Sequence, residues 1–251
     1  MPVRSVVVAL SGPSGVGKST TAAGLEQAFG WAHLEEAYCR LVPRPRLTWS
    51  TEVGLERLEL RLLDEEAQRY REACELAAAG TPVVVDTSFL DPVAYIAGLY
   101  RLGLAEGSTM HAVAARARRL AREGRLGVPD LTVYLTVPPE VVRRRAARDP
   151  RRHPPALRDR HAAVGRVEAT TLVPALRRSV GVRCVRVRAD VRPDRLAGRI
   201  AARARRTAPL REPERTLLRV LDELLRSLGP RGGPRAAGKV KKGTLSPRPP
   251  R

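Results

Sequence analysis

Long apolar runs are missing from this sequence. No stretch approaches the roughly 20 consecutive apolar residues that a membrane-spanning helix needs. The apolar segment at residues 6–10 is too short for the core of a secretion signal, and it leads straight into a glycine-rich stretch. We therefore expect no membrane partner and a soluble protein that stays in the cytoplasm.

Cysteine and histidine are also scarce. The three cysteines, Cys39, Cys74 and Cys184, form no CxxC pair, which disfavours both a disulfide framework and a zinc site. The four histidines show no ligand spacing either. We interpret the cysteines as small hydrophobic side chains and the histidines as structural or exposed.

Lysine is rare as well, so arginine supplies nearly all of the positive charge. The formal net charge is +20, and only four of the 46 basic residues are lysines: Lys18, Lys239, Lys241 and Lys242. Clustered cations attract nucleic acid, but here arginine is scattered through every region instead of forming one stripe. We expect nucleic acid to make at most a weak electrostatic contact, through the C-terminal tail.

This tail, residues 229–251, has a composition of its own. It contains seven basic residues and no acidic one, and it is rich in glycine and proline. Because it has almost no large apolar side chains to pack, the sequence predicts a disordered basic tail. Ahead of it we expect one domain over residues 1–206, with a lid at about 143–160, and then an amphipathic helix at 207–228.

Strands and helices alternate along the predicted domain. Apolar, β-branched runs predict strands at residues 3–11, 31–36, 81–86, 130–137 and 182–187. Helical patterns occur at residues 18–29, 52–79, 92–102, 110–123, 140–148, 157–180, 193–206 and 210–228. Prolines make residues 38–50 an irregular connection. The order predicts an α/β fold, with a doubly wound parallel sheet of about five strands and helices on both faces.

A phosphate-binding loop follows the first predicted strand. The segment Gly12-Pro13-Ser14-Gly15-Val16-Gly17-Lys18-Ser19, with Thr20 after it, fits the P-loop pattern GxxxxGK[ST] and lies between a strand and a helix. Its amides point at phosphates, Lys18 reaches the terminal phosphates, and the Ser19 hydroxyl coordinates magnesium. Lys18 is the only lysine in the first 238 residues, so this position demands a compact ammonium. We therefore predict binding of ATP, or another nucleoside triphosphate, with Mg²⁺.

Carboxylates end the second and third predicted strands. Asp86 lies at the sheet edge where α/β folds bind ligands, and it is a candidate catalytic residue and a ligand for magnesium or its water shell. Alternatively, it begins a turn or caps the next helix. Glu35 and Glu36 face opposite ways on a strand, so one of them can act as a base toward an acceptor hydroxyl. We prefer Glu36, with the alternative that both are solvated loop carboxylates.

Arginines crowd the predicted lid. Most of them would form a solvated helix face. Guanidinium groups on a lid also neutralise the transferring charge in phosphoryl-transfer sites. We expect this role for one or two of Arg144, Arg148 and Arg152, and we name Arg144 and Arg148 as the catalytic candidates.

With these residues in place, the sequence resembles the P-loop nucleoside and nucleotide kinases, the group that contains thymidylate kinases and deoxynucleoside kinases. The likeness covers about residues 2–206 and rests on the phosphate loop, the two glutamates, Asp86-Thr87-Ser88 and the arginine-rich lid. In nucleoside kinases the acid at the end of the second strand acts as a base, so the resemblance implies this role for Glu35 or Glu36. It also implies an arginine after the third-strand acid, for phosphate and substrate. Thr87 stands there instead, which argues against specific recognition of a nucleoside monophosphate.

The leading hypothesis is an ATP-dependent kinase that transfers the γ-phosphoryl group to a small-molecule acceptor, first of all a nucleoside or nucleotide. A small-alcohol or antibiotic phosphotransferase of the same fold is an alternative, because a fold does not fix the acceptor. A third is a non-kinase P-loop ATPase whose basic tail binds nucleic acid or a protein. The sequence leaves the identity of the acceptor and the formation of a homodimer open.

Overall fold

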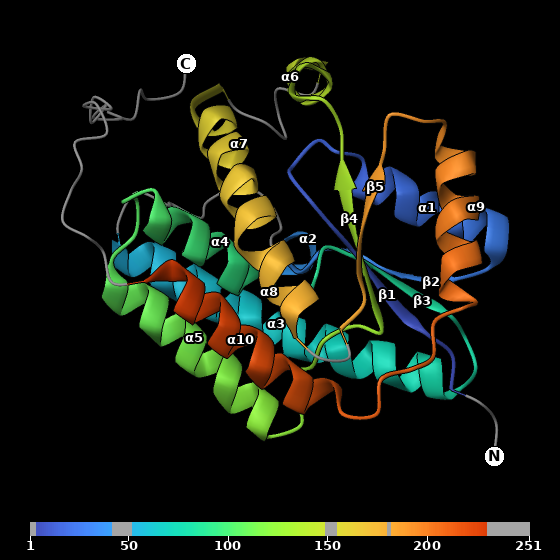
Figure 1. The fold of residues 1–251 in the computed structure, drawn as a ribbon, viewed down its shortest axis with the longest axis horizontal. Coiled ribbons are helices and arrows are strands. Elements are labelled where there is room, and N and C mark those ends of the chain that lie inside the picture. The colour runs from blue at the N-terminus through green and yellow to red at the C-terminus, as the bar shows by residue number, and fades with distance from the viewer. Residues whose placement is uncertain (1–3, 42–51, 149–154, 180–181, 230–251) are drawn as a thin grey trace, which may run out of the picture.

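The fold is built around one parallel sheet. A computed structural model describes residues 4–41, 52–148, 155–179 and 182–229. Within these ranges the strands follow the order β2-β3-β1-β4-β5, and every neighbouring pair is parallel (Figure 1). The strands are β1 (Val7–Ser11), β2 (Ala32–Leu34), β3 (Val83–Asp86), β4 (Leu131–Thr136) and β5 (Cys184–Arg188). The predicted α/β fold with its five-stranded parallel sheet is confirmed.

Helices cover both faces of the sheet because its central strands are apolar on both sides. Val8 and Leu10 of β1 point toward α1 (Lys18–Phe29) and α9 (Pro193–Ala204) (Figure 1). Val7 and Ala9 point toward the opposite core. Burying each large apolar side chain contributes about 1.5–3 kcal/mol. The second core is closed by α3 (Glu52–Ala78), α4 (Asp91–Arg101), α5 (Gly107–Arg122), α7 (Pro155–Thr170), α8 (Leu172–Arg178) and α10 (Pro213–Leu228).

The C-terminal helix α10 belongs to this second core. Leu217, Val220, Leu221 and Leu224 recur at helical spacing and are all buried. They join the same cluster as the buried side chains of α5 and α8. Pro213 occupies the first helical position, where a missing backbone donor costs nothing. The helix is therefore packed on the domain through its entire apolar stripe.

Two predictions, one of an irregular connection and one of a continuous helix, were wrong in part. Residues 38–41, predicted as irregular, lie in the short helix α2 (Ala37–Leu41), because the prolines come only after it. The helix predicted at 157–180 is divided into α7 and α8 at Thr171. Pro174 explains the break, since a proline ring clashes with the carbonyl four residues earlier. Residues 42–50 and 230–251 of the predicted connection and tail lie outside the described residues.

The parallel sheet brings the candidate site residues to one edge. The carboxyl ends of β1, β2 and β3 all lie at this edge, at Ser11, Leu34 and Asp86. The phosphate loop directly follows β1, the two glutamates directly follow β2, and Asp86 is the last residue of β3. Open α/β sheets bind their ligands at this edge. Over the described residues, no helix is both long and apolar enough to cross a membrane.

Candidate active site

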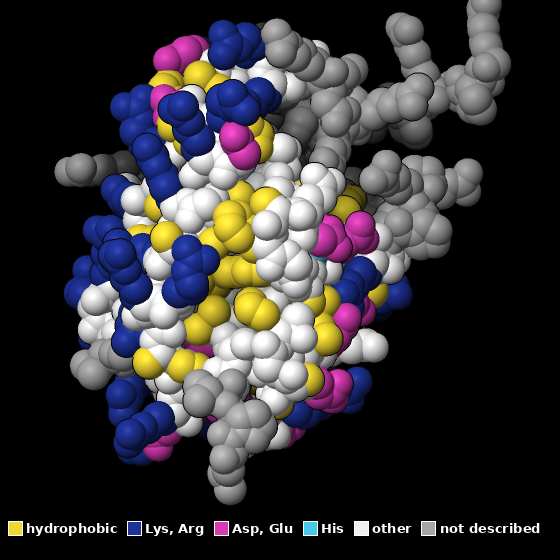
Figure 2. All heavy atoms as spheres, turned by 90° about the vertical axis from the view of Figure 1, so that its right-hand side faces the viewer, with side chains coloured by type: hydrophobic (Ala, Val, Ile, Leu, Met, Phe, Trp, Pro, Cys, Tyr) yellow, Lys and Arg dark blue, Asp and Glu magenta, His cyan; other side chains and the backbone are white. Residues whose placement is uncertain are grey.

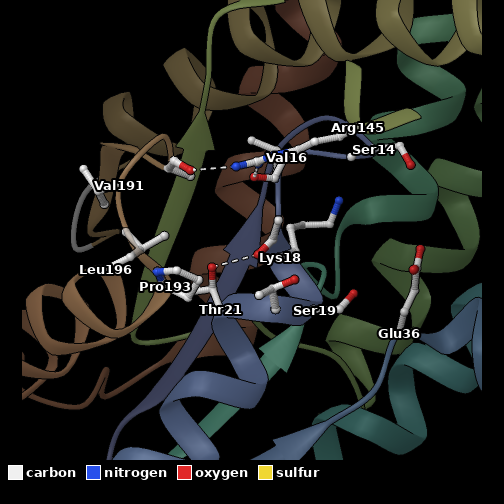
Figure 3. A pocket seen from close by; sticks show the side chains of 14 residues that line it. Ser14, Val16, Lys18, Ser19, Thr21, Glu36, Arg145, Val191, Pro193 and Leu196 are labelled. Atoms are coloured by element: carbon white, nitrogen blue, oxygen red, sulfur yellow. Dashed lines mark hydrogen bonds between the residues drawn. The ribbon is translucent and has the colours of Figure 1, made fainter. Parts of the chain in front are cut away.

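The phosphate loop is folded as its glycines require. Gly12 has a φ of 131°, and a Cβ there would lie 2.5 Å from the carbonyl oxygen of Leu135 on β4. Gly17, with a φ of 107°, is the left-handed N-cap residue of α1. The Thr21 hydroxyl donates to the Gly17 carbonyl at 2.7 Å (Figure 3). Together these contacts direct the positive N-terminus of α1 at the space above the loop.

A cavity of about 390 Å³ lies over this loop (Figure 3). Its size falls in the range of about 300–1,000 Å³ that small-molecule sites occupy. One wall is the P-loop from Ser14 through Thr21, and the others include Glu36, Arg145 and a largely apolar side after β5. This last side consists of Ala189, Val191, Pro193 and Leu196.

Lys18 extends into the cavity from the start of α1. Its Nζ donates a hydrogen bond of 2.9 Å to the Gly12 carbonyl, so the ammonium is held over the loop (Figure 3). Ser19 lines the same cavity. Thr20, the last predicted nucleotide-binding residue, also lines it although its side chain is largely exposed. The loop thus presents one ammonium, hydroxyls and a helix N-terminus to a single space, a set of groups suited to phosphate.

The two glutamates after β2 have different environments. Glu35 is exposed, whereas Glu36 is half-buried and lines the cavity (Figure 3). Burial raises the pKa of Glu36 above its ordinary value; the positive charge of Lys18 opposes this rise, and the charges of Asp91 and Asp86 add to it. A carboxylate with a raised pKa is a better proton acceptor near neutral pH.

Asp86 is almost fully buried at the end of β3. Asp86 is only 4% exposed, and its Oδ1 atom has no hydrogen-bond partner. The next residue, Thr87, has a φ of 71° although it is β-branched, and its hydroxyl donates to the Asp86 carbonyl at 2.6 Å. Holding a non-glycine residue in this left-handed conformation costs on the order of 1–3 kcal/mol. Residues with such strained backbone conformations cluster at functional sites. The turn fixes a bare carboxylate oxygen at the sheet edge.

That oxygen fits a magnesium ion shared with a nucleotide. Mg²⁺ prefers oxygen ligands, usually a few from the protein together with water and substrate phosphates. Ser19 and Asp86 provide such oxygens, and Asp86 Oδ1 lacks any donor that would compete. Among the described residues, no group of three or more His, Cys, Asp or Glu side chains is arranged to hold a metal. Phosphate oxygens would therefore have to complete the shell.

Arg69 on α3 is a site residue that sequence reasoning missed. It is 0% exposed, and it donates to the carbonyls of Asp86 at 2.8 Å and Leu34 at 3.3 Å. A third bond, of 2.5 Å, joins it to the Glu66 carboxylate. Arg69 thereby ties the ends of β2 and β3 together and sets the separation between the segments that carry Glu36 and Asp86.

Four further carboxyl groups, three of them buried and Asp91 half-buried, were also missed. Glu59 and Glu66 lie on α3, Asp91 lies in the first turn of α4, and Glu168 lies on α7. Glu59, Glu66 and Arg69 recur at intervals of seven and three, so they share a helix face with the buried leucines of α3. Charges placed on an apolar stripe were the signal that could have identified them.

Helix α6 (Pro139–Arg148), at the start of the segment predicted as a lid, turns Arg145 inward, a residue that was not among the predicted candidates. Arg145 lines the cavity and donates to the Val16 carbonyl at 2.7 Å and the Ala189 carbonyl at 3.3 Å (Figure 3). Arg144 is exposed. The side chain of Arg148, and Arg152 altogether, lie outside the described residues.

A parallel α/β sheet with a P-loop between β1 and α1 defines a P-loop nucleotide-binding fold. Residues 7–192 match the family model AAA_28, described as an AAA domain. The match spans most of the chain, so the chain belongs to this family of P-loop proteins. The search of curated proteins finds no match.

Solved structures of the same fold are nucleoside and nucleotide kinases. A deoxyadenosine kinase from M. mycoides, with the products dCMP and dCDP, superposes with a TM-score of 0.62 at 14% identity, covering 80% of this chain and 99% of its own. The EHV4 thymidine kinase complexed with TP4A gives 0.58 at 13%, covering 91% and 100%. Thymidylate kinase from Candida albicans gives 0.55 at 16%, covering 82% and 93%. At these identities the likeness establishes a shared fold.

Proposed function

We propose that the protein is an ATP-dependent kinase that phosphorylates a hydroxyl group of a small molecule. One observation carries the proposal: a half-buried carboxylate, Glu36, lines the same cavity as the phosphate loop, while its neighbour Glu35 faces away. A carboxylate at this position can accept a proton from the group that attacks the γ-phosphorus. A kinase needs one to accept the proton of the acceptor.

The reaction is an in-line displacement at the γ-phosphorus. The acceptor oxygen forms the new O–P bond, the bond from the γ-phosphorus to the bridging oxygen breaks, and ADP leaves with that electron pair. The acceptor proton passes to the Glu36 carboxylate. Lys18 and the loop amides hold the phosphates in position. A magnesium ion held by Ser19 and Asp86 would neutralise phosphate charge.

The acceptor is proposed to be unphosphorylated, with nucleosides as the first compounds to test. The solved neighbours include a deoxyadenosine kinase with nucleotide products or with dATP bound, which favours a nucleoside-like scaffold. Thr87 occupies the position where the resemblance calls for arginine. Arg69 lies nearby, but both of its terminal nitrogens already donate to Glu66, Leu34 and Asp86. Cytoplasmic location, a homodimer and weak binding of nucleic acid by the tail stay predictions.

The test is an acceptor screen with purified full-length protein. ADP release would be measured with ATP and Mg²⁺ across nucleosides, nucleotides and small alcohols, and the phosphorylated product would be identified by mass spectrometry. With the best acceptor, Glu36→Gln should lower kcat by about 100-fold to 10,000-fold, because a general base contributes that much. Nucleotide affinity should change little, since the phosphates are held by other groups.

Glu35→Gln is the matched control for Glu36→Gln. It removes the same charge one residue away, from an exposed side chain, so kcat should stay within about twofold. Equal and small effects of both substitutions would remove these carboxylates from the mechanism. ATP hydrolysis unaffected by every acceptor would favour a P-loop ATPase over a kinase.

A further inference from the structure

Net positive charge is concentrated in one part of the folded domain, the edge strand β5 and the helix α9. Residues 183–211 contain ten arginines and two acidic residues, so they carry a net charge of +8. Residues 1–182 together carry only +6. Arginine occurs along the entire chain, but acidic residues balance most of it elsewhere and do not balance it here. We name residues 183–211 the β5–α9 segment.

The exposed face of α9 presents this charge as a regular row. Arg195, Arg199 and Arg203 follow one another at intervals of four residues, and all three are exposed. A helix rises about 1.5 Å per residue, so these residues lie on one face at steps of about 6 Å. Helix α9 lies on the side of the molecule that Figure 2 shows, where Lys and Arg side chains gather along one edge of the view. We name the three residues the arginine stripe.

The acidic residues of the β5–α9 segment do not neutralise the arginine stripe. Both are paired with arginines outside it, Arg188 with Asp190 and Arg192 with Asp194. Exposed arginines of other helices have acidic partners from neighbouring elements: on α5, Arg116 pairs with Asp64 and Arg118 with Asp222. Among the described residues, no ion pair joins the stripe to a carboxylate. Its three charges are therefore available to a partner outside this chain.

The phosphate backbone of a nucleic acid is the partner that this surface fits. The large apolar side chains of α9, Leu196 and Ile200, are buried against the domain, so the helix has no apolar face to insert among lipids. Guanidinium groups match phosphate oxygens with two parallel hydrogen bonds. A strand of duplex nucleic acid presents one phosphate about every 3.4 Å along its axis. The stripe is about 12 Å long and so spans about three or four phosphates.

We propose that the β5–α9 segment forms a binding surface for the phosphate backbone of nucleic acid, with the arginine stripe at its centre. The proposal is independent of the kinase reaction, because the stripe residues lie outside the lining of the cavity over the phosphate loop. Residues 182–206 include no Asn, Gln, Ser or Thr, the neutral side chains that hydrogen-bond base edges. Binding should therefore depend on phosphate charge and little on base sequence.

Fluorescence anisotropy with a labelled DNA duplex of about 20 base pairs tests the proposal. The full-length protein would be titrated at several salt concentrations between about 50 and 200 mM, because released counterions make such binding salt-dependent. The triple variant Arg195→Gln, Arg199→Gln, Arg203→Gln should bind at least about tenfold more weakly at about 100 mM salt. Its slope of log K against log salt concentration should be shallower by about 3, one unit for each lost phosphate contact. Two duplexes of unrelated sequence should bind alike.

Two further triple variants separate the position of the charge from its amount. Arg119→Gln, Arg122→Gln, Arg125→Gln removes three charges from exposed positions in and just after α5, and its DNA affinity should stay within about threefold of the wild type. Replacing the three stripe residues by lysine keeps the charge and should also keep the affinity within about threefold, since an ammonium binds phosphate as well. Circular dichroism checks that all three variants are folded, as expected for exposed positions.

Weaker binding and a shallower salt slope in the glutamine variant of the stripe alone support the proposal. Three results overturn it: no binding by the wild type at about 100 mM salt, wild-type affinity of the stripe variant, or an equal loss in the α5 variant. Vesicles of phosphatidylserine with phosphatidylcholine, and poly-glutamate, are tested in parallel. If either of them binds through the stripe while the duplex does not, the partner is a membrane or an acidic protein, and the nucleic-acid proposal is wrong.

Discussion

Lys18 is an exception to the amino-acid composition of this chain, which otherwise uses arginine for its basic residues. Every other basic residue before position 239 is arginine, yet the P-loop keeps a lysine. A guanidinium is planar and needs several partners in one plane, whereas an ammonium is a compact point charge. The 2.9 Å bond from Lys18 to the Gly12 carbonyl shows how little room the loop leaves above its own backbone.

We therefore predict that Lys18→Arg fails almost as completely as Lys18→Ala. Both variants should lose phosphoryl transfer by at least about 100-fold, because neither can place a single positive charge on the terminal phosphates. The fold should persist, since Lys18 faces the cavity and not a core. Turnover and circular dichroism of the two variants check this, and full activity of the folded Lys18→Arg protein would contradict the steric argument.

At the scale of elements, Arg145 connects α6 to the phosphate loop. Arg145 spans from the lid helix to the Val16 carbonyl of the loop and the Ala189 carbonyl after β5, and it lines the cavity. A guanidinium held by two carbonyls is ordered in advance at the rim where phosphates would lie. Arg144, one residue earlier, is exposed.

We predict that Arg145→Ala raises KM for ATP by about tenfold or more and lowers kcat, because it removes both a charge near the phosphates and the link from lid to loop. Arg144→Ala changes the same helix and the same net charge at an exposed position, so it should alter both constants by less than about threefold. Steady-state kinetics on the two variants compare them directly. A larger effect at Arg144 would show that the lid moves before it acts.

The contrast between Arg144 and Arg145 shows what the sequence can predict of this site. The P-loop pattern and the alternation of strands and helices along the chain followed from local sequence, because motif spacing and apolar periodicity are local properties. The rotation of a short arginine-rich helix depends on what it packs against, which no local pattern carries. Arg69 escaped for the same reason, since the Leu34 and Asp86 carbonyls that it binds lie on two strands far from α3 in the sequence.

At the scale of the whole molecule, most of the arginine side chains are exposed, whereas the carboxyl groups of Glu59, Glu66 and Glu168 are buried. On the face shown in Figure 2, Lys and Arg side chains gather along one side, and Arg195, Arg199 and Arg203 of α9 are all exposed. Exposed charges cost little because water and salt screen them. The buried carboxyl groups have no such screening, so the free-energy cost of burying them changes with pH.

Glu168 sets the last prediction. Burial, with the charge of Asp91 adding to it and that of Lys18 opposing it, raises the pKa of Glu168 from 4.5 to about 8 in the folded protein. Between these two values the folded state holds a proton that the unfolded state has lost, so the contribution of Glu168 to stability falls as pH rises, by at most about 1.4 kcal/mol per pH unit. Above about pH 8 both states are ionised and the loss is complete.

Glu168→Gln removes this dependence while keeping the size of the side chain. Its free energy of unfolding should match that of the wild type near pH 5 and exceed it increasingly toward pH 8, because glutamine cannot ionise. Urea unfolding at pH 5, 6, 7 and 8 measures the difference, with Glu75→Gln as the exposed control that should show almost none. A difference that is constant with pH would mean that Glu168 is ionised in the folded protein throughout.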